Sequence, residues 1–111
     1  NDVAILAPRG WLMGDNETDQ LEAAIRQLLE SGNRRLVLDL IDVSHMNSTA
    51  IGMLVGCHTS YCNRKGVLKI CNAGAKIQSV LVITQLVRVF DLYGSEREAI
   101  ESFNHVQQQK A

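Results

Sequence analysis

Three polar residues at a predicted strand-to-helix turn are the first place where this sequence could do chemistry. The apolar run of residues 36–41 ends, Asn47, Ser48 and Thr49 follow, and apolar residues then return at helical spacing. All three residue types are common N-caps, and Asn47 alone can accept the hydrogen bond that a helix start needs. Ser48 and Thr49 are then two further hydroxyls in an exposed first turn. We therefore expect this turn to do more than cap a helix.

A hydrolytic reaction at Ser48 would need a general base held beside it. His45 is three residues away, but it lies on the preceding turn, and nothing in the sequence orients it. The chain also lacks a glycine-rich phosphate loop, because Gly52 and Gly56 lie inside the predicted helix. We expect no catalytic residue, no cofactor and no enzyme activity.

Metal binding is also disfavoured by the pattern. A possible cation site precedes one predicted helix, but acids there more often interact favourably with the helix dipole: Asp15, Glu17 and Asp19. The cysteines are not spaced as metal pairs and are predicted to be small buried side chains in a reducing cytoplasm: Cys57, Cys62 and Cys71. We expect no bound metal and a cytoplasmic protein.

The helix that follows the turn carries small residues on one face. Gly52, Gly56 and Ser60 recur at every fourth position. Each interior glycine costs a helix about 1 kcal/mol relative to alanine. Two explanations fit this face, namely close packing against a neighbouring helix or docking of another protein. The residues alone leave both explanations open.

The hydrophobic pattern predicts one α/β domain in which strands and helices alternate. Predicted strands cover residues 3–6, 10–13, 36–41 and 67–71, with a short edge strand near 91–93. Predicted helices cover residues 48–64 and 75–84, followed by an apolar turn at 86–90. A further helix begins at a cap on Thr18 or Asp19 and ends at Gly32, and the last helix follows a capping box between Ser95 and Glu98. Residues 107–111 are expected to form a frayed tail.

Length and charge limit the classes of function. A chain of 111 residues is one domain, and its net charge of -1 gives no electrostatic footprint for nucleic acid or an anionic membrane. No apolar run approaches the roughly 20 residues that a membrane span needs. Because the chain begins at Asn1 without a Met, we expect an excised or trimmed domain.

Two segments that together cover most of the chain carry a family pattern. They are residues 34–73, RRLVLDLIDVSHMNSTAIGMLVGCHTSYCNRKGVLKICNA, and residues 80–103, VLVITQLVRVFDLYGSEREAIESF. They resemble the STAS domain, the family of anti-sigma factor antagonists. The matching positions are Leu38-Asp39-Leu40, Asp42-Val43, Gly66, Val80-Leu81, Leu86, Phe90 and Glu98-Ala99-Ile100. The resemblance implies a single STAS-type domain over residues 1–111, with a small mixed β-sheet and helices packed mainly on one side.

The resemblance also assigns expected functions to the turn. Ser48 aligns with the usual phosphoacceptor serine, and Asn47, Thr49 and Ala50 stand where the family has Asp, Ser and Gly. The implied partner is a serine kinase/anti-sigma factor, bound while Ser48 is unphosphorylated and released on phosphorylation. Thr49 is the fallback acceptor. The expected partner-binding residues are Asn47, Ser48, Thr49, Gly52 and Gly56.

A second hypothesis follows from the departures at Asn47 and Ala50. One branch of the family works without phosphorylation, such as the accessory subunit of bacterial lipid-transport systems. In that case the chain is a constitutive subunit of a membrane-associated assembly and needs a hydroxyl at position 48 or 49 only for contact. Under either hypothesis we expect a protein partner, no membrane insertion and no direct contact with nucleic acid.

Overall fold

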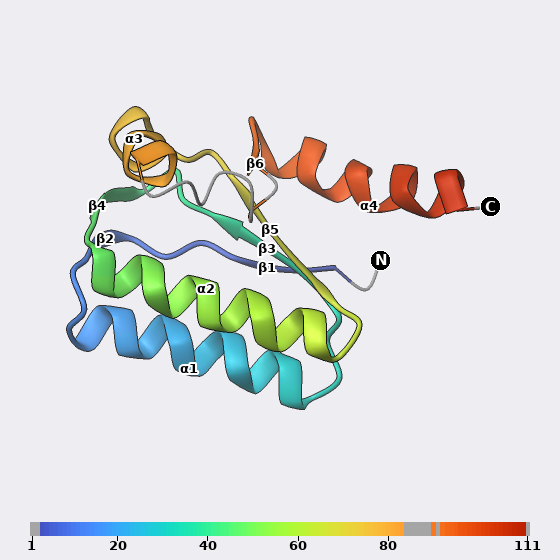
Figure 1. Cartoon of the computed structure of the whole chain (residues 1–111), viewed down its shortest axis with the longest axis horizontal. Helices are drawn as coiled ribbons and strands as arrows, with labels where there is room; N and C mark the ends of the chain where they lie inside the picture. The colour runs from blue at the N-terminus through green and yellow to red at the C-terminus, as the bar shows by residue number, and fades with distance from the viewer. Residues whose placement is uncertain (1–2, 84–89, 91, 111) are drawn as a thin grey trace.

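A four-stranded and a two-stranded sheet, both parallel, form the framework of the computed structural model, which describes residues 3–83, 90 and 92–110 (Figure 1). The larger sheet has the order β1 (Val3–Leu6), β3 (Arg35–Asp39), β5 (Val67–Cys71) and β6 (Leu92–Tyr93). The smaller sheet pairs β2 (Gly10–Leu12) with β4 (Val43–Met46). It lies at one end of the molecule, where it leads directly into the helix that follows β4.

Four helices surround these sheets: α1 (Asn16–Glu30), α2 (Ser48–Asn63), α3 (Ala75–Ile83) and α4 (Glu96–Lys110). Figure 1 shows α1 and α2 side by side along one face of the larger sheet and α4 on the opposite face. Among the described residues, no helix has both the length and the apolar character needed to cross a membrane.

The two faces of the central strand β3 belong to two different cores. Leu36 and Leu38 are fully buried in the large core formed with α1 and α2. Val37 between them is equally buried but packs with Ala99 and Phe103 of α4. Successive side chains of a strand point to opposite faces, so a strand covered on both faces needs a continuous apolar run. This is why residues 36–38 carry no polar side chain.

The interface beneath α4 contains a buried lysine. Lys69 of β5 is only 2% exposed, and its Nζ donates hydrogen bonds to the Tyr93 hydroxyl at 3.1 Å and to Ser102 Oγ at 2.6 Å. The same ammonium group lies 4.4 Å from the centroid of the Phe103 ring. A buried charge is tolerated when hydrogen bonds and aromatic faces replace its water. Lys69 therefore ties α4 to the sheet through polar as well as apolar contacts.

The predicted α/β class is confirmed, and β1 and β5 have the predicted bounds. The strand β4 was not predicted, because the pairing that stabilises it joins Gly10 to Val43 and cannot be seen in a local pattern. Every described strand pair is parallel, although we expected a mixed sheet. The predicted strand 36–41 is shifted to 35–39, and the predicted helix 48–64 ends one residue earlier.

The predicted start of α1 is wrong. Its N-cap position is Asp15, and the helix begins at Asn16 rather than after Thr18 or Asp19. Thr18 lies inside the first turn, where it is 3% exposed and its Oγ1 accepts a hydrogen bond from the backbone N–H of Gly14 at 2.9 Å. Its hydroxyl therefore supports the preceding loop instead of capping the helix.

The predicted capping box of α4 is confirmed in one half. Ser95 Oγ accepts a hydrogen bond from the backbone N–H of Glu98 at 3.2 Å. The Glu98 carboxylate accepts in turn from the N–H of Gly94 rather than from that of Ser95. The helix α4 continues to Lys110 and so includes most of the expected tail, whereas residues 86–89 of the predicted apolar turn lie outside the described residues.

Candidate functional site

The start of α2 is built around Asn47. Its backbone N–H donates to the carbonyl of Leu12 at 3.2 Å, which continues the pairing of β4 with β2. Its side-chain Oδ1 accepts from the N–H of Ala50 at 3.0 Å, and its Nδ2 donates to the carbonyl of Met13 at 2.7 Å. Asn47 is therefore the N-cap of α2, as predicted, and it also fastens the helix to the end of β2.

Ser48 and Thr49 both project from the exposed first turn of α2. Within the part of the chain that the structure describes, neither hydroxyl takes part in a hydrogen bond. Thr49 is the more engaged side chain, because its Cγ2 would lie 2.8 Å from a Cβ placed on Gly14. The first backbone N–H groups of a helix have no intrahelical partner, so they can stabilise an anion attached to this turn.

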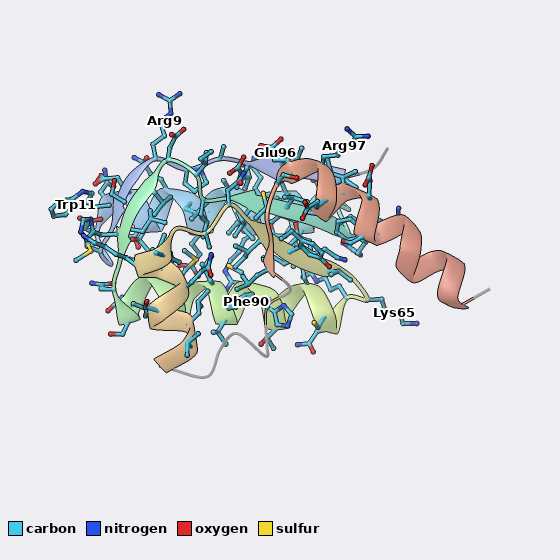
Figure 2. All side chains as sticks on the ribbon, turned by 90° about the horizontal axis from the view of Figure 1, so that it is seen from above. Arg9, Trp11, Lys65, Phe90, Glu96 and Arg97 are labelled. Carbon is cyan, nitrogen blue, oxygen red and sulfur yellow. The ribbon has the colours of Figure 1, made fainter. Side chains whose placement is uncertain are left out.

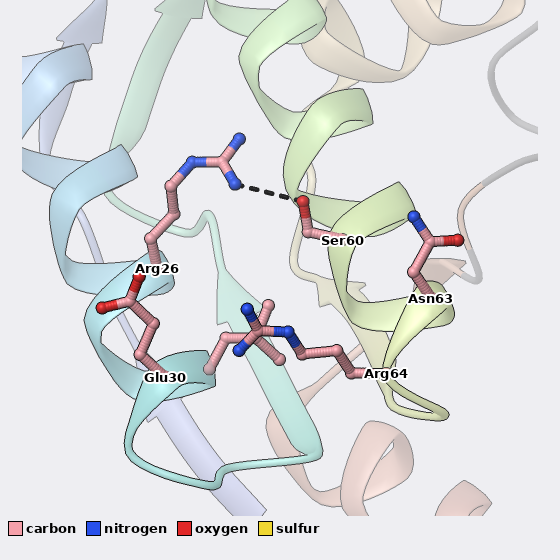
Figure 3. A pocket seen from close by; sticks show the side chains of 6 residues that line it. Arg26, Glu30, Ser60, Asn63 and Arg64 are labelled. Atoms are coloured by element: carbon pink, nitrogen blue, oxygen red, sulfur yellow. Dashed lines mark hydrogen bonds between the residues drawn. The ribbon is translucent and has the colours of Figure 1, made fainter.

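Gly52 and Gly56 occupy different surroundings. A Cβ on Gly52 would meet open space, and the residue is exposed. A Cβ on Gly56 would lie 3.6 Å from Nη2 of Arg26 on α1. The same guanidinium donates through Nη1 to Ser60 Oγ at 3.1 Å (Figure 3). Gly56 and Ser60 therefore face Arg26 of the neighbouring helix, with room for a Cβ at position 56, whereas Gly52 remains on the open surface near Ser48.

Sequence reasoning missed an exposed aromatic group at this end of the molecule. Trp11 of β2 is 59% exposed, and its ring lies 4.6 Å from the ring of His45 on β4. Met13, whose carbonyl binds Asn47, is 39% exposed. Figure 2 shows Trp11 projecting at one extreme of the molecule. Exposed tryptophans are frequent anchors of protein interfaces, so the single Trp of the chain was the available signal.

His45 does not form a base–nucleophile pair with Ser48 in the described structure. Its ring contacts the Trp11 ring at an interplanar angle of 48°, and its Nδ1 is buried without a hydrogen-bond partner among the described residues. A serine nucleophile needs a base within hydrogen-bond reach and a third group that orients that base. The arrangement at the start of α2 is therefore suited to contact or modification rather than to acyl transfer.

A second group of titratable side chains lies where β3 ends and α4 begins. Burial opposes the ionisation of Asp39, but hydrogen bonds from Glu96, from Asn72 and from the backbone N–H of Ile41 outweigh it and lower the Asp39 pKa. The hydrogen bond to Asp39, followed by burial, raises the pKa of Glu96. No group of three or more metal-binding side chains occurs in the described ranges.

The cysteines divide by position. Cys57 and Cys71 are buried as predicted, and burial raises their thiol pKa values to about 11 and about 12. Cys62 is exposed, so the prediction of burial was wrong for this residue. It lies on the outer face of α2, where its Sγ is 3.6 Å from Nε2 of His58.

Comparison with known proteins gives matches along most of the chain. A family model described as the STAS domain matches residues 1–99. A protein of Thermotoga maritima named "Putative anti-sigma factor antagonist" is 28% identical over 101 residues, which are 91% of this chain and 89% of that protein. The crystal structure of a "putative anti-sigma factor antagonist", also from Thermotoga maritima, superposes with a TM-score of 0.85 at 26% identity, and the match covers 92% of this chain and 87% of that one.

Two further solved structures have the same fold in different settings. The phosphorylated form of the Bacillus cell fate determinant SpoIIAA has a TM-score of 0.73 at 18% identity, with 92% of this chain and 91% of that chain covered. The STAS domain of a SulP transporter from Vibrio cholerae has a TM-score of 0.76 at 20% identity, with 97% and 86% covered. At these identities the likeness concerns the fold alone.

Proposed function

Because this chain belongs to the STAS domain family, we propose that it is a protein-interaction module switched by phosphorylation of Ser48. The unphosphorylated form binds a serine kinase/anti-sigma factor, and the phosphorylated form releases it. The name of the Thermotoga maritima relative, an anti-sigma factor antagonist, supports a protein partner of this kind.

The observation that carries the proposal is the unused hydroxyl of Ser48. Asn47 caps the helix, so the fold does not need the Ser48 side chain, which is exposed and forms no hydrogen bond among the described residues. A kinase can reach such a hydroxyl without unfolding the domain. A phosphate placed there meets free backbone N–H groups and the positive end of the helix dipole, so the modified domain stays folded. Thr49 is the second acceptor, but its methyl group contacts the Gly14 loop.

The proposed partner face surrounds this hydroxyl. It consists of Asn47, Ser48, Thr49 and Gly52, with Trp11 and Met13 as apolar neighbours on the same end of the molecule. Gly56, half-buried beside Arg26, lies one turn further along the helix. Phosphorylation adds a charge of about -1.5 to -2 that must remain solvated. A partner that covers this face with apolar or acidic groups is then excluded by local electrostatics, without any refolding.

Two substitutions at Ser48 test the switch. Ser48→Ala is expected to fold normally and to bind the kinase/anti-sigma factor constitutively. Ser48→Asp is expected to fold normally but to bind about 5- to 150-fold more weakly, the usual range for such couplings. Thr59→Asp is the matched control, because Thr59 is exposed on the same helix and the substitution adds the same charge about 16 Å further along the helix axis. The measurements are titration by calorimetry and mass spectrometry of the parent after incubation with the kinase and ATP.

Two results together would overturn the proposal. The parent takes up phosphate at neither Ser48 nor Thr49, and Ser48→Asp binds as tightly as the parent. The constitutive, membrane-associated subunit then becomes the better explanation of the same surface.

A further inference from the structure

The turn that ends α2 places a lysine where the backbone favours glycine. The N–H of Gly66 donates to the carbonyl of Tyr61 at 2.7 Å, and the N–H of Lys65 donates to that of Cys62 at 3.0 Å. These two bonds form a Schellman motif, whose left-handed position is usually glycine. Lys65 occupies that position with φ of 63°. A residue with a Cβ makes the folded state less stable there than glycine would. The Lys65 side chain is therefore not explained by the stability of the turn.

Two turns bring four cations together at this end of the molecule. The N–H of Val67 donates to the carbonyl of Arg34 at 2.8 Å, and Val67 is the register partner of Arg35. A Cβ on Gly66 would lie 2.8 Å from the same Arg34 oxygen, so the α1–β3 and α2–β5 turns are in direct contact. We refer to the four cations of these turns as the basic end: Arg34, Arg35, Arg64 and Lys65.

Two cations of the basic end, Arg64 and Lys65, take no part in the ion pairs between described residues, which are Arg9–Asp42, Arg26–Glu22 and Arg97–Glu101. Arg34 uses Nη1 to bind the carbonyl of Leu29, and the Arg35 guanidinium lies over the Phe103 ring at 5.9 Å. Arg64 and Lys65 are exposed. Cations at helix C-termini interact favourably with the dipole, which explains the sign of these charges but not a Cβ at position 65.

The cations border two open hollows. One has a volume of about 230 Å³ between the ends of α1 and α2 and is lined by Arg26, Leu29, Glu30, Ser60, Asn63 and Arg64. In Figure 3 Arg64 reaches across it from the end of α2 toward α1. The other hollow, of about 490 Å³, is lined by Gly32, Asn33, Arg34 and Arg35 and contains no acid. Guanidinium groups bind carboxylates through paired hydrogen bonds, so the second opening fits an acidic side chain, whereas the first already contains the Glu30 carboxylate.

We propose that the basic end is a second docking surface, which binds an acidic segment of a partner protein. A lipid surface fits less well, because Trp11, the side chain best suited to a membrane interface, lies at the opposite end of the molecule from Lys65 (Figure 2). A nucleic acid fits less well, because the chain has a net charge of -1. The inference is independent of the Ser48 switch, since the two surfaces lie at opposite ends of α2.

Charge reversal with a matched control tests this surface. A fluorescently labelled poly-glutamate peptide is titrated with the parent at low ionic strength, with a poly-glutamine peptide as the neutral probe. The double variant Arg64→Glu/Lys65→Glu is expected to lower the affinity by about tenfold or more, because two attractions become repulsions. Arg9→Glu/Arg97→Glu makes the same change in net charge at two side chains that are 85% and 86% exposed, and it is expected to change the affinity by less than about twofold. Equal losses in the two double variants, or equal binding of the two peptides by the parent, would overturn the proposal.

Lys65→Gly separates docking from folding. This variant is expected to raise the denaturation midpoint, because glycine suits the left-handed position, and at the same time to weaken poly-glutamate binding. A more stable variant that binds the peptide as well as the parent would show that the Lys65 charge is not used. In the last experiment, binding of the parent and of the Arg64→Glu/Lys65→Glu variant to vesicles containing phosphatidylserine is measured. If they bind the parent through Arg64 and Lys65 while poly-glutamate does not, the surface is a membrane contact and the proposal fails.

Discussion

The two ends of α2 solve the same problem of unpaired backbone groups in opposite ways. At the start, the Asn47 side chain caps the helix and leaves the neighbouring Ser48 hydroxyl unused. At the end, backbone hydrogen bonds alone close the turn, and Lys65 occupies a position that favours glycine. In both places one side chain is not accounted for by the fold. The comparison indicates two kinds of candidate functional residue. One is a polar side chain that the hydrogen bonds of the fold do not need, such as Ser48, and the other is a side chain that makes its own turn less stable, such as Lys65.

The largest expected effect is at Gly66, which closes the far end of α2. A Cβ there would lie 2.8 Å from the Arg34 carbonyl oxygen and 3.0 Å from Tyr61 Cδ2. The oxygen cannot move away without disturbing its bond to the N–H of Val67. Gly66→Ala is therefore expected to destabilise the domain by about 2–3 kcal/mol in urea denaturation. A loss below about 0.5 kcal/mol would show that the turn is more adaptable than this contact implies.

The second effect is at Asn47, which closes the near end. Asn47→Ala removes both the cap to Ala50 and the bond to the Met13 carbonyl, and is expected to cost about 2 kcal/mol. Asn47→Asp keeps the cap but places a carboxylate oxygen against the Met13 carbonyl, so a loss of about 1 kcal/mol is expected. Denaturant titration of the two variants checks the order. If Asn47→Asp is as stable as the parent, the bond to Met13 contributes nothing to the fold.

A smaller, stabilising effect distinguishes the two glycines between these ends. Gly52→Ala and Gly56→Ala are both expected to raise the stability by about 0.5–1 kcal/mol, because alanine is the better helix former. A Cβ meets open space at Gly52 and only an ordinary contact with Arg26 at Gly56. Of the two variants, only Gly52→Ala is expected to lower the affinity for the partner that binds around Ser48. Equal weakening by both variants would extend the partner face to the second turn of α2.

The smallest expected effect on stability is at Ser48. Ser48→Ala is expected to change the free energy of unfolding by less than about 0.5 kcal/mol, because the hydroxyl forms no hydrogen bond among the described residues. Thermal denaturation monitored by circular dichroism checks this value. A loss of more than 1 kcal/mol would mean that Ser48 shares the capping task with Asn47, and it would remove the contrast between the two ends.

The sequence predicts elements whose stability comes from local pattern or continuous burial. The strand Val67–Cys71 and the N-cap at Asn47 were predicted correctly for this reason. The start of α1 was not, because Thr18 has the residue type of a cap but uses its hydroxyl to bind Gly14. Trp11 was missed as part of the site because its place beside α2 depends on the pairing of β2 with β4. That pairing joins residues 33 or 34 positions apart, and no local pattern reports it.

The parallel register of the sheets also determines how the chain can reach this structure. Val3 pairs with Arg35, and Arg35 pairs with Val67, so each ladder of β3 joins residues 32 positions apart. No described strand pair can form as a hairpin, because parallel strands need a crossover between them. Each ladder must therefore close a long loop before it gains any hydrogen bond, and folding rates fall as contacts become less local. We expect the domain to fold more slowly than a helical bundle of equal length, with α1 and α2 docking on β3 at the rate-limiting step.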